Sequence, residues 1–255
     1  MIRAAVALAA ALLAGFIAFP IAGLIFHQSP AAFVVALQAP SAQAALRLSL
    51  LTTLCSLALT VGLGTPLAYI LARRVFPGRA LVDALVDLPI VVPPAVAGLA
   101  LLLAFGRAGT LGPALHALGI NLSFTTAAVV LAQTFVASPF FVRAARSGFA
   151  TVDQTLEAAS ATLGMGPLRT FALVTIPLAA PALTGGIVLC WARALGEFGA
   201  TIMFAGNLSG VSQTLPLAVY LDLEGGDVAG ATALSVVLIA VSLAVVAGIR
   251  SVERR

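Results

Sequence analysis

Long apolar runs alternate with short polar segments along the chain, and this alternation limits the folds open to it. Six runs are long enough to predict helices, over residues 4–26, 48–72, 88–105, 123–142, 178–205 and 228–249. An α-helix needs about 20 residues to cross the hydrocarbon core of a bilayer. Only 9% of the residues are charged, whereas a soluble domain carries about a quarter. We therefore predict an all-α membrane protein with six transmembrane helices in one domain, residues 1–255.

The third run contains residues that break helices. Pro93 and Pro94 lie inside it, and proline removes backbone hydrogen bonds that a helix in lipid needs. This span is therefore predicted to be kinked or to begin late, and to pack against protein rather than lipid.

The arginines indicate which segments face the cytoplasm, because cytoplasmic loops of membrane proteins are enriched in Lys and Arg. The chain has no lysine and 13 arginines. With the N-terminus inside, the outer segments hold only Arg47 and Arg107, Arg193 lies within a run, and the other ten fall in inner segments. Both termini are therefore predicted to be cytoplasmic. The net charge of +4 is interpreted as this topology signal, and not as a sign of nucleic-acid binding.

One polar interruption, residues 143–177, is too long and too regular for a simple connecting loop. Its pattern predicts a helix, a glycine turn and a second helix. Either Thr151 or Asp153 fits the N-cap of the first helix, which should run through Leu163. Gly164 then turns the chain. We expect this ordered segment to dock against a partner protein on the cytoplasmic side.

The fifth run contains a pair of opposite charges. Arg193 and Glu197 are four residues apart, so on a helix they can neutralise each other and reduce the cost of burial in lipid. Two interpretations stay open: a gate or pathway element facing the bundle interior, or a structural pair that holds helices together. Gly196 and Gly199 beside Glu197 would let another backbone approach closely.

The outer segment over residues 213–226 is predicted to form a short interfacial helix with Asp222 and Glu224 exposed. Such a helix could cradle a docking partner. The alternative is a solvated re-entrant turn.

Several chemistries are excluded by missing residues. A nucleotide-binding P-loop needs a lysine, and the chain has none. No Ser/His/Asp set or carboxylate pair gathers in one polar segment, so no catalytic residue is assigned. The two cysteines lie in apolar runs and the two histidines are far apart, so neither a disulfide nor a metal or cofactor site is expected. If ATP powers this protein, the ATPase is another polypeptide.

The polar interruption resembles the EAA loop of ABC importer permeases. The resemblance rests on Glu157-Ala158-Ala159, on Gly164 seven positions after the glutamate, and on Ile176-Pro177 at the end of the loop. It implies a coupling helix that inserts into a cleft on an ATPase subunit. The coupling site would comprise the ends of the predicted helix and the matched motif residues: Asp153, Glu157, Ala158, Ala159, Leu163 and Gly164.

The resemblance extends over roughly residues 45–245 and is closest to molybdate permeases. It is carried by stretches such as GTPLAYILARRVFPGR, VVPPAVAGLALLL, ARALGEFGATIMFAGN and SQTLPLAVY. Sulfate permeases share the GEFG stretch, and tungstate permeases are similar enough to stay an alternative. The resemblance implies the type I ABC importer permease fold in the plasma (inner) membrane. It also implies a homodimer of this chain, two copies of the ATPase subunit and an extracytoplasmic oxyanion-binding protein.

Such a transporter would work by alternating access, with ATP-driven closure of the ATPase subunits moving the coupling helices. For the pathway we assign the charged pair Arg193 and Glu197 and the neutral polar groups Thr201 and Asn207. Because the charged pair is balanced, we expect oxyanion selectivity to lie mainly in the binding protein. Competing hypotheses are a gradient-driven secondary transporter or channel, and a structural subunit without a pathway.

Overall fold

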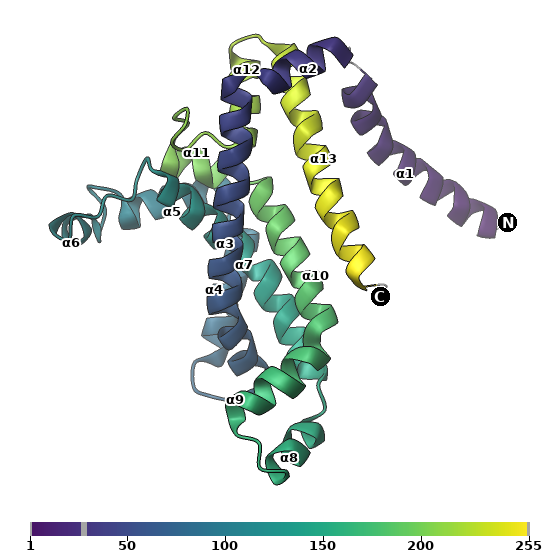
Figure 1. The fold of residues 1–255 in the computed structure, drawn as a ribbon, viewed down its shortest axis with the longest axis vertical. Coiled ribbons are helices and arrows are strands. Elements are labelled where there is room, and N and C mark those ends of the chain that lie inside the picture. The colour runs from purple at the N-terminus through teal and green to yellow at the C-terminus, as the bar shows by residue number, and fades with distance from the viewer. Residues whose placement is uncertain (1, 27–29, 254–255) are drawn as a thin grey trace.

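A computed structural model describes residues 2–26 and 30–253, and all regular structure in those residues is helical. Figure 1 shows a long bundle with short helices at its ends. The helices are α1 (Ile2–Phe26), α2 (Pro30–Gln38), α3 (Pro40–Arg73), α4 (Arg79–Val91), α5 (Pro94–Phe105), α6 (Gly112–Ala117), α7 (Thr126–Thr151), α8 (Gln154–Thr162), α9 (Pro167–Thr170), the π-helix η1 (Phe171–Thr175), α10 (Ile176–Leu195), α11 (Gly199–Ala205), α12 (Leu215–Glu224) and α13 (Val228–Glu253).

The structure supports several membrane spans. Four helical stretches, within α1, α3, α7 and α9 to α10, are long and apolar enough to cross a membrane. Helices α4 and α5 together make a fifth if the pair counts as one bent span. Residues Val228–Ala244 of α13 form a shorter apolar helix that coincides with the sixth predicted run. The all-α membrane class is thus confirmed, and the count of six spans stays a prediction.

Two predicted spans are not continuous helices. The third run is divided between α4 and α5, whose axes differ by 119°, and the break falls at Pro93, as the loss of backbone donors at proline predicts. The predicted fifth span, residues 178–205, is wrong as a single helix. Helix α10 ends at Leu195 and α11 begins only at Gly199.

Helix α7 continues nine residues past the predicted end of the fourth span, so residues 143–151 are helix and not loop. Packing explains the extension, because Ala145 and Phe149 of this segment are buried in the core of the bundle. Arg146 also pairs with Asp83, and Arg143 Nε lies 3.6 Å from Asp87 Oδ1, but such partly exposed ion pairs add little. Apolar periodicity alone therefore placed the end of this helix too early.

The centre of the bundle is α7, which packs between α3 and α10. Its buried small residues, including Ala137 and Ala145, let the neighbouring helices approach closely. Near the α8 end, the rings of Tyr69, Phe149 and Phe171 form an aromatic cluster, with the Tyr69 and Phe171 centroids 4.9 Å apart. This cluster joins α3, α7 and η1, so it fixes the base of the segment that carries α8.

Helix α3 buries a row of hydroxyl side chains, and most of them have hydrogen-bond partners. Thr52 and Thr53 donate to the carbonyl oxygens of Leu48 and Ser49 at 2.9 and 2.7 Å. Hydroxyls of Ser and Thr can satisfy themselves within a helix in this way and still pack closely. The row therefore serves close contact between α3 and its neighbours.

Two of the segments that the arginines assigned to opposite sides, the polar interruption and residues 213–226, lie at opposite ends of the bundle, whereas α6, the start of α1 and the end of α13 lie between those ends (Figure 1). Helices α8 and α9 are at one end of the long axis, and α2 and α12 are at the other (Figure 1). The end of α3 is beside α8, because Arg73 contacts Glu157 there. The predicted short helix in residues 213–226 is confirmed as α12.

Candidate coupling site

Helix α8 begins with a side-chain cap. Asp153 Oδ1 accepts a hydrogen bond from the backbone N–H of Thr155 at 2.9 Å, and this bond lowers the pKa of the Asp153 carboxyl below its usual value. Thr151 is the last residue of α7, and its hydroxyl donates to the Gly148 carbonyl instead. Of the two caps that the sequence allowed, the structure therefore has Asp153.

Helix α8 ends in a Schellman motif at Gly164. The N–H of Met165 donates to the Ser160 carbonyl and the N–H of Gly164 to the Ala161 carbonyl, both at 3.0 Å. Gly164 has φ +84°, a left-handed conformation that costs other L-residues about 1–2 kcal/mol. The predicted glycine stop is confirmed, and the helix ends at Thr162 with Leu163 as its C-cap, one residue before its predicted end.

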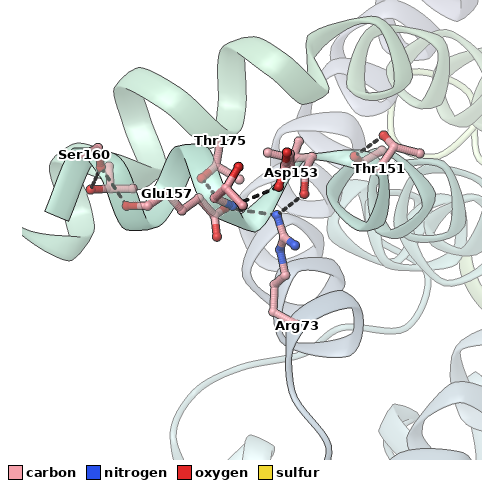
Figure 2. Close-up of polar contacts among 10 residues, drawn as sticks. Arg73, Thr151, Asp153, Glu157, Ser160 and Thr175 are labelled. Atoms are coloured by element: carbon pink, nitrogen blue, oxygen red, sulfur yellow. Dashed lines mark hydrogen bonds and ion pairs between the residues drawn. The ribbon is translucent and has the colours of Figure 1, made fainter. Parts of the chain in front are cut away.

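Glu157 points back into the chain and ties α8 to two other elements (Figure 2). Its Oε1 lies 3.1 Å from Arg73 Nη2 at the end of α3, and it accepts a hydrogen bond from the Thr175 hydroxyl of η1 at 2.7 Å. The same Arg73 nitrogen donates to the Val152 carbonyl at 2.9 Å. We call Arg73, Glu157 and Thr175 the α8 anchor.

A second contact holds α8 against the returning chain. The hydroxyls of Ser160 and Thr170 are 2.6 Å apart and buried. Together with the α8 anchor, this contact fixes the inner face of α8 at two points one turn apart, Glu157 and Ser160. A helix held in this way can transmit a displacement instead of yielding to it.

The rest of α8 is uncovered. Leu156, Leu163 and, just beyond the turn, Leu168 expose 47%, 84% and 84% of their surface, and Ala158 and Ala159 are also exposed. Leucines exposed in a cluster mark an interaction site more often than isolated ones do. Of the six predicted coupling residues, five are therefore accessible to a partner, and Glu157 is directed inward.

The four predicted pathway residues fall into separate environments. Arg193 Nη2 lies 2.6 Å from Glu197 Oε2, so the predicted ion pair is present. Thr201 is fully buried on α11, and its hydroxyl has no partner among the described residues. The Asn207 amide donates to the Leu217 carbonyl at 3.0 Å, which ties the loop after α11 to α12. The structure thus brings only the charged pair together.

Only one of the two glycines beside Glu197 allows a close approach between elements. A Cβ on Gly199 would lie 2.8 Å from Pro94 Cβ of α5, so a larger residue would push α5 away. A Cβ on Gly196 would meet nothing closer than 3.8 Å, in its own turn of helix. The close approach predicted at this break is therefore made by Gly199.

Comparison with known proteins identifies the family of this chain. Residues 64–255 match the family model described as "Binding-protein-dependent transport system inner membrane component". The chain belongs to this family. It is 44% identical over 236 residues to the molybdenum transport system permease protein ModB of Mycobacterium tuberculosis, which covers 92% of this chain and 88% of that protein.

Two further likenesses bear on substrate and fold. A probable sulfate transport system permease protein cysT from Nephroselmis olivacea is 35% identical over 227 residues, 89% of this chain and 80% of its own length. The crystal structure of a bacterial ABC transporter for import of the acidic polysaccharide alginate contains a chain of the same fold, with a TM-score of 0.76 at 18% identity. That likeness covers 100% of this chain and 97% of the solved one.

Sequence reasoning missed part of this site. Arg73 was interpreted only as one of the inner arginines, and Thr175 only as part of the second helix. An arginine at the last residue of an apolar run is a signal of position in the membrane. Nothing local shows that it will meet a carboxylate 84 positions later.

Gly164 offers a test of the turn that ends α8. Gly164→Ala places a Cβ on a residue at φ +84°, so we expect the turn to be destabilised by about 1–2 kcal/mol. If the partner binds only the intact turn, this free energy corresponds to a roughly fivefold to thirtyfold weaker contact through α8. The matched control is Gly166→Ala, because Gly166 has an ordinary φ of −70° and free space around it. Binding of the ATPase subunit to each purified variant measures the effect. Equal weakening by both variants would contradict the role given to the turn.

Proposed function

We propose that this chain is the permease subunit of an ABC importer that passes molybdate across the plasma membrane, driven by ATP hydrolysis on a separate subunit. The observation that carries the proposal is the 44% identity to a molybdenum permease along 92% of the chain. The likeness to the sulfate permease is lower, at 35%. Tungstate and sulfate remain the alternative substrates, since all three are tetrahedral oxyanions.

Helix α8 is the proposed coupling helix. Its exposed leucines and alanines would enter a cleft on the ATPase subunit, with Asp153, Ala158, Ala159, Leu163 and Gly164 at or beside the contact. Glu157 would support the contact from inside, because its carboxylate is held by Arg73 and Thr175. An apolar helix face of this kind is a recurring mode of recognition between proteins.

The full transporter would contain two copies of this chain and two ATPase subunits, with a binding protein that delivers the oxyanion from outside. On the arginine bias, the α8 end and both termini would face the cytoplasm, and the α2 and α12 end would face outside. The chain would then cross the membrane six times, with α4 and α5 forming one bent span. Closure of the ATPase subunits would move α8, and through the α8 anchor it would move α3 and η1.

The deciding experiment is uptake into proteoliposomes that contain this chain, its cognate ATPase and the loaded binding protein. We expect uptake of labelled molybdate to require ATP and to be blocked by excess tungstate but not by sulfate. Blocking by sulfate would move the chain to the sulfate group and leave the architecture unchanged. Uptake that ignores ATP would favour the gradient-driven transporter or channel and would overturn the coupling role of α8.

A further inference from the structure

A cavity of about 320 Å³ lies at the end of the molecule opposite α8. It is enclosed by α2, the start of α3, the loop before α12, α12 itself and the start of α13. Its polar lining consists of Ser41, Ser209, Gln213, Asp222 and Asp227. We call this the outer cavity. It shares no residue with the coupling site or with the proposed pathway.

Two carboxylates converge in the outer cavity over one glycine. A Cβ built on Gly230 would lie 3.0 Å from Asp222 Oδ2 and closer still to Asp227 Oδ2. Asp227 uses its other oxygen to accept the Gly230 N–H at 2.8 Å, which caps the start of α13. In the described part of the chain, neither carboxylate has a basic side chain within ion-pair distance.

The protein therefore keeps two negative charges side by side without a counter-charge of its own. Burial, and then the neighbouring Asp227, raise the pKa of Asp222 above its usual value. Asp222 is half-buried and Asp227 exposed, so both carboxylates can be reached by a cationic group from outside the chain.

A buried amide adds an independent observation. Gln213 lines the outer cavity and is only 5% exposed. Its backbone N–H donates to the Leu208 carbonyl, but its side chain makes no hydrogen bond to any described residue. Its amide therefore has no protein partner among the described residues and is available to a group that enters the cavity.

The lining fixes the chemistry of the occupant. Two carboxylates repel an oxyanion, so molybdate itself cannot be the ligand here. A bare divalent ion requires oxygen ligands at about 2.0–2.6 Å, whereas a cavity of about 320 Å³ is in the size range of small-molecule sites. An arginine side chain fits these demands better, because its planar group offers five N–H donors to carboxylate and amide oxygens.

We infer, on the basis of the proposed function, that the outer cavity receives a basic side chain, preferably arginine, of the extracytoplasmic binding protein. The outer position fits this partner, because α12 lies at the end assigned to the outside. A charge contact of this kind fixes the register of a docked protein as well as adding affinity. Docking would also supply the counter-charge that Asp222 and Asp227 lack.

The test compares binding of the molybdate-loaded binding protein to the complete transporter in lipid nanodiscs. Asp222→Asn with Asp227→Asn is expected to weaken binding about tenfold to a hundredfold and to reduce its dependence on salt. Asparagine is nearly as good an N-cap as aspartate, so the start of α13 is kept. Glu224→Gln is the matched control, because it removes a negative charge from the same segment but outside the outer cavity. It should bind as the wild type does.

A second variant keeps the charges and blocks the space. Gly230→Ala should weaken binding similarly, since its Cβ occupies the point where the two carboxylates meet. If the wild type binds but the double variant binds equally well, the inference on the outer cavity is wrong and the proposed function stands. If the wild type does not bind the loaded binding protein at all, both fail. Loss of wild-type binding on chelation with EDTA, absent in the double variant, would identify a metal site and overturn the inference.

Discussion

Arg73→Gln is expected to leave the spans assembled but to uncouple ATP hydrolysis from molybdate uptake. Arg73 is the residue of α3 that contacts Glu157 and the Val152 carbonyl, so it links α8 to the membrane bundle. Its loss leaves the Glu157 carboxylate with only the Thr175 hydroxyl as partner. Removing one member of a largely buried ion pair costs about 3–5 kcal/mol. We therefore expect uptake per ATP hydrolysed to fall at least tenfold.

The neighbouring residue provides the control. Arg74 is exposed and forms no ion pair among the described residues, so Arg74→Gln removes the same charge without breaking the α8 anchor. Uptake and ATPase activity measured in the same proteoliposomes separate coupling from assembly. If Arg73→Gln transports with the wild-type ratio of uptake to hydrolysis, the α8 anchor does not transmit the movement.

A double-mutant cycle with Glu157→Gln tests how Glu157 acts. If Glu157 works through Arg73, the double variant should be no worse than either single variant, with an interaction energy of about 1–3 kcal/mol. If Glu157 contacts the ATPase subunit directly, its loss should add to the loss of Arg73. Copurification of the ATPase subunit measures this, and Glu157→Lys should abolish it in either case, because a lysine cannot bind Arg73.

The parts of the coupling site that depend on neighbouring residues were predicted from the sequence. The turn at Gly164 follows from local hydrogen bonds and from the left-handed conformation that glycine permits, and Asp153 was one of the two caps that the sequence allowed. The α8 anchor was not predicted, because it joins side chains 84 positions apart. Local rules contain no information about which elements meet in space.

The same limit explains the errors in the spans. The apolar runs predicted the helical membrane class, and four helical stretches, or five with the bent pair α4 and α5, are long and apolar enough to span. Apolar patterning ended the fourth helix at residue 142, whereas α7 continues to Thr151 because Ala145 and Phe149 pack into the core between the polar residues. The sequence prediction also joined α10 and α11 into one helix, because Gly196 and Phe198 lie inside a continuous apolar run. The break between α10 and α11 depends on the contacts of the Glu197 side chain with Arg193 and with the Ala200 N–H.

Glu197→Ala is expected to impair folding strongly. The Glu197 side chain is 1% exposed and bridges the break between α10 and α11. One oxygen accepts the Ala200 N–H at 2.8 Å at the start of α11, and the other lies 2.6 Å from Arg193 at the end of α10. Alanine leaves a helix N–H and a cation unpaired in the membrane, which should cost about 3–5 kcal/mol. Folded yield in detergent, measured by size-exclusion chromatography, should fall severalfold.

A graded set of variants separates the two interpretations of the Arg193–Glu197 pair, as a gate or as a structural contact. Glu197→Gln can still accept the Ala200 N–H but leaves Arg193 without a counter-charge, so its yield should be intermediate. Combining it with Arg193→Gln removes the unpaired charge, and the yield should recover, since replacing both members of a buried pair costs much less than replacing one.

The uptake of this double variant then decides between structure and gate. The burial of Glu197 and its bond to the start of α11 favour a structural role, so the double variant should transport molybdate at close to the wild-type rate. A double variant that folds with wild-type yield and thermal stability but does not transport would show that the charges themselves take part in the pathway. In that case the pair acts as a gate, and the passing oxyanion meets an arginine whose charge is balanced by Glu197.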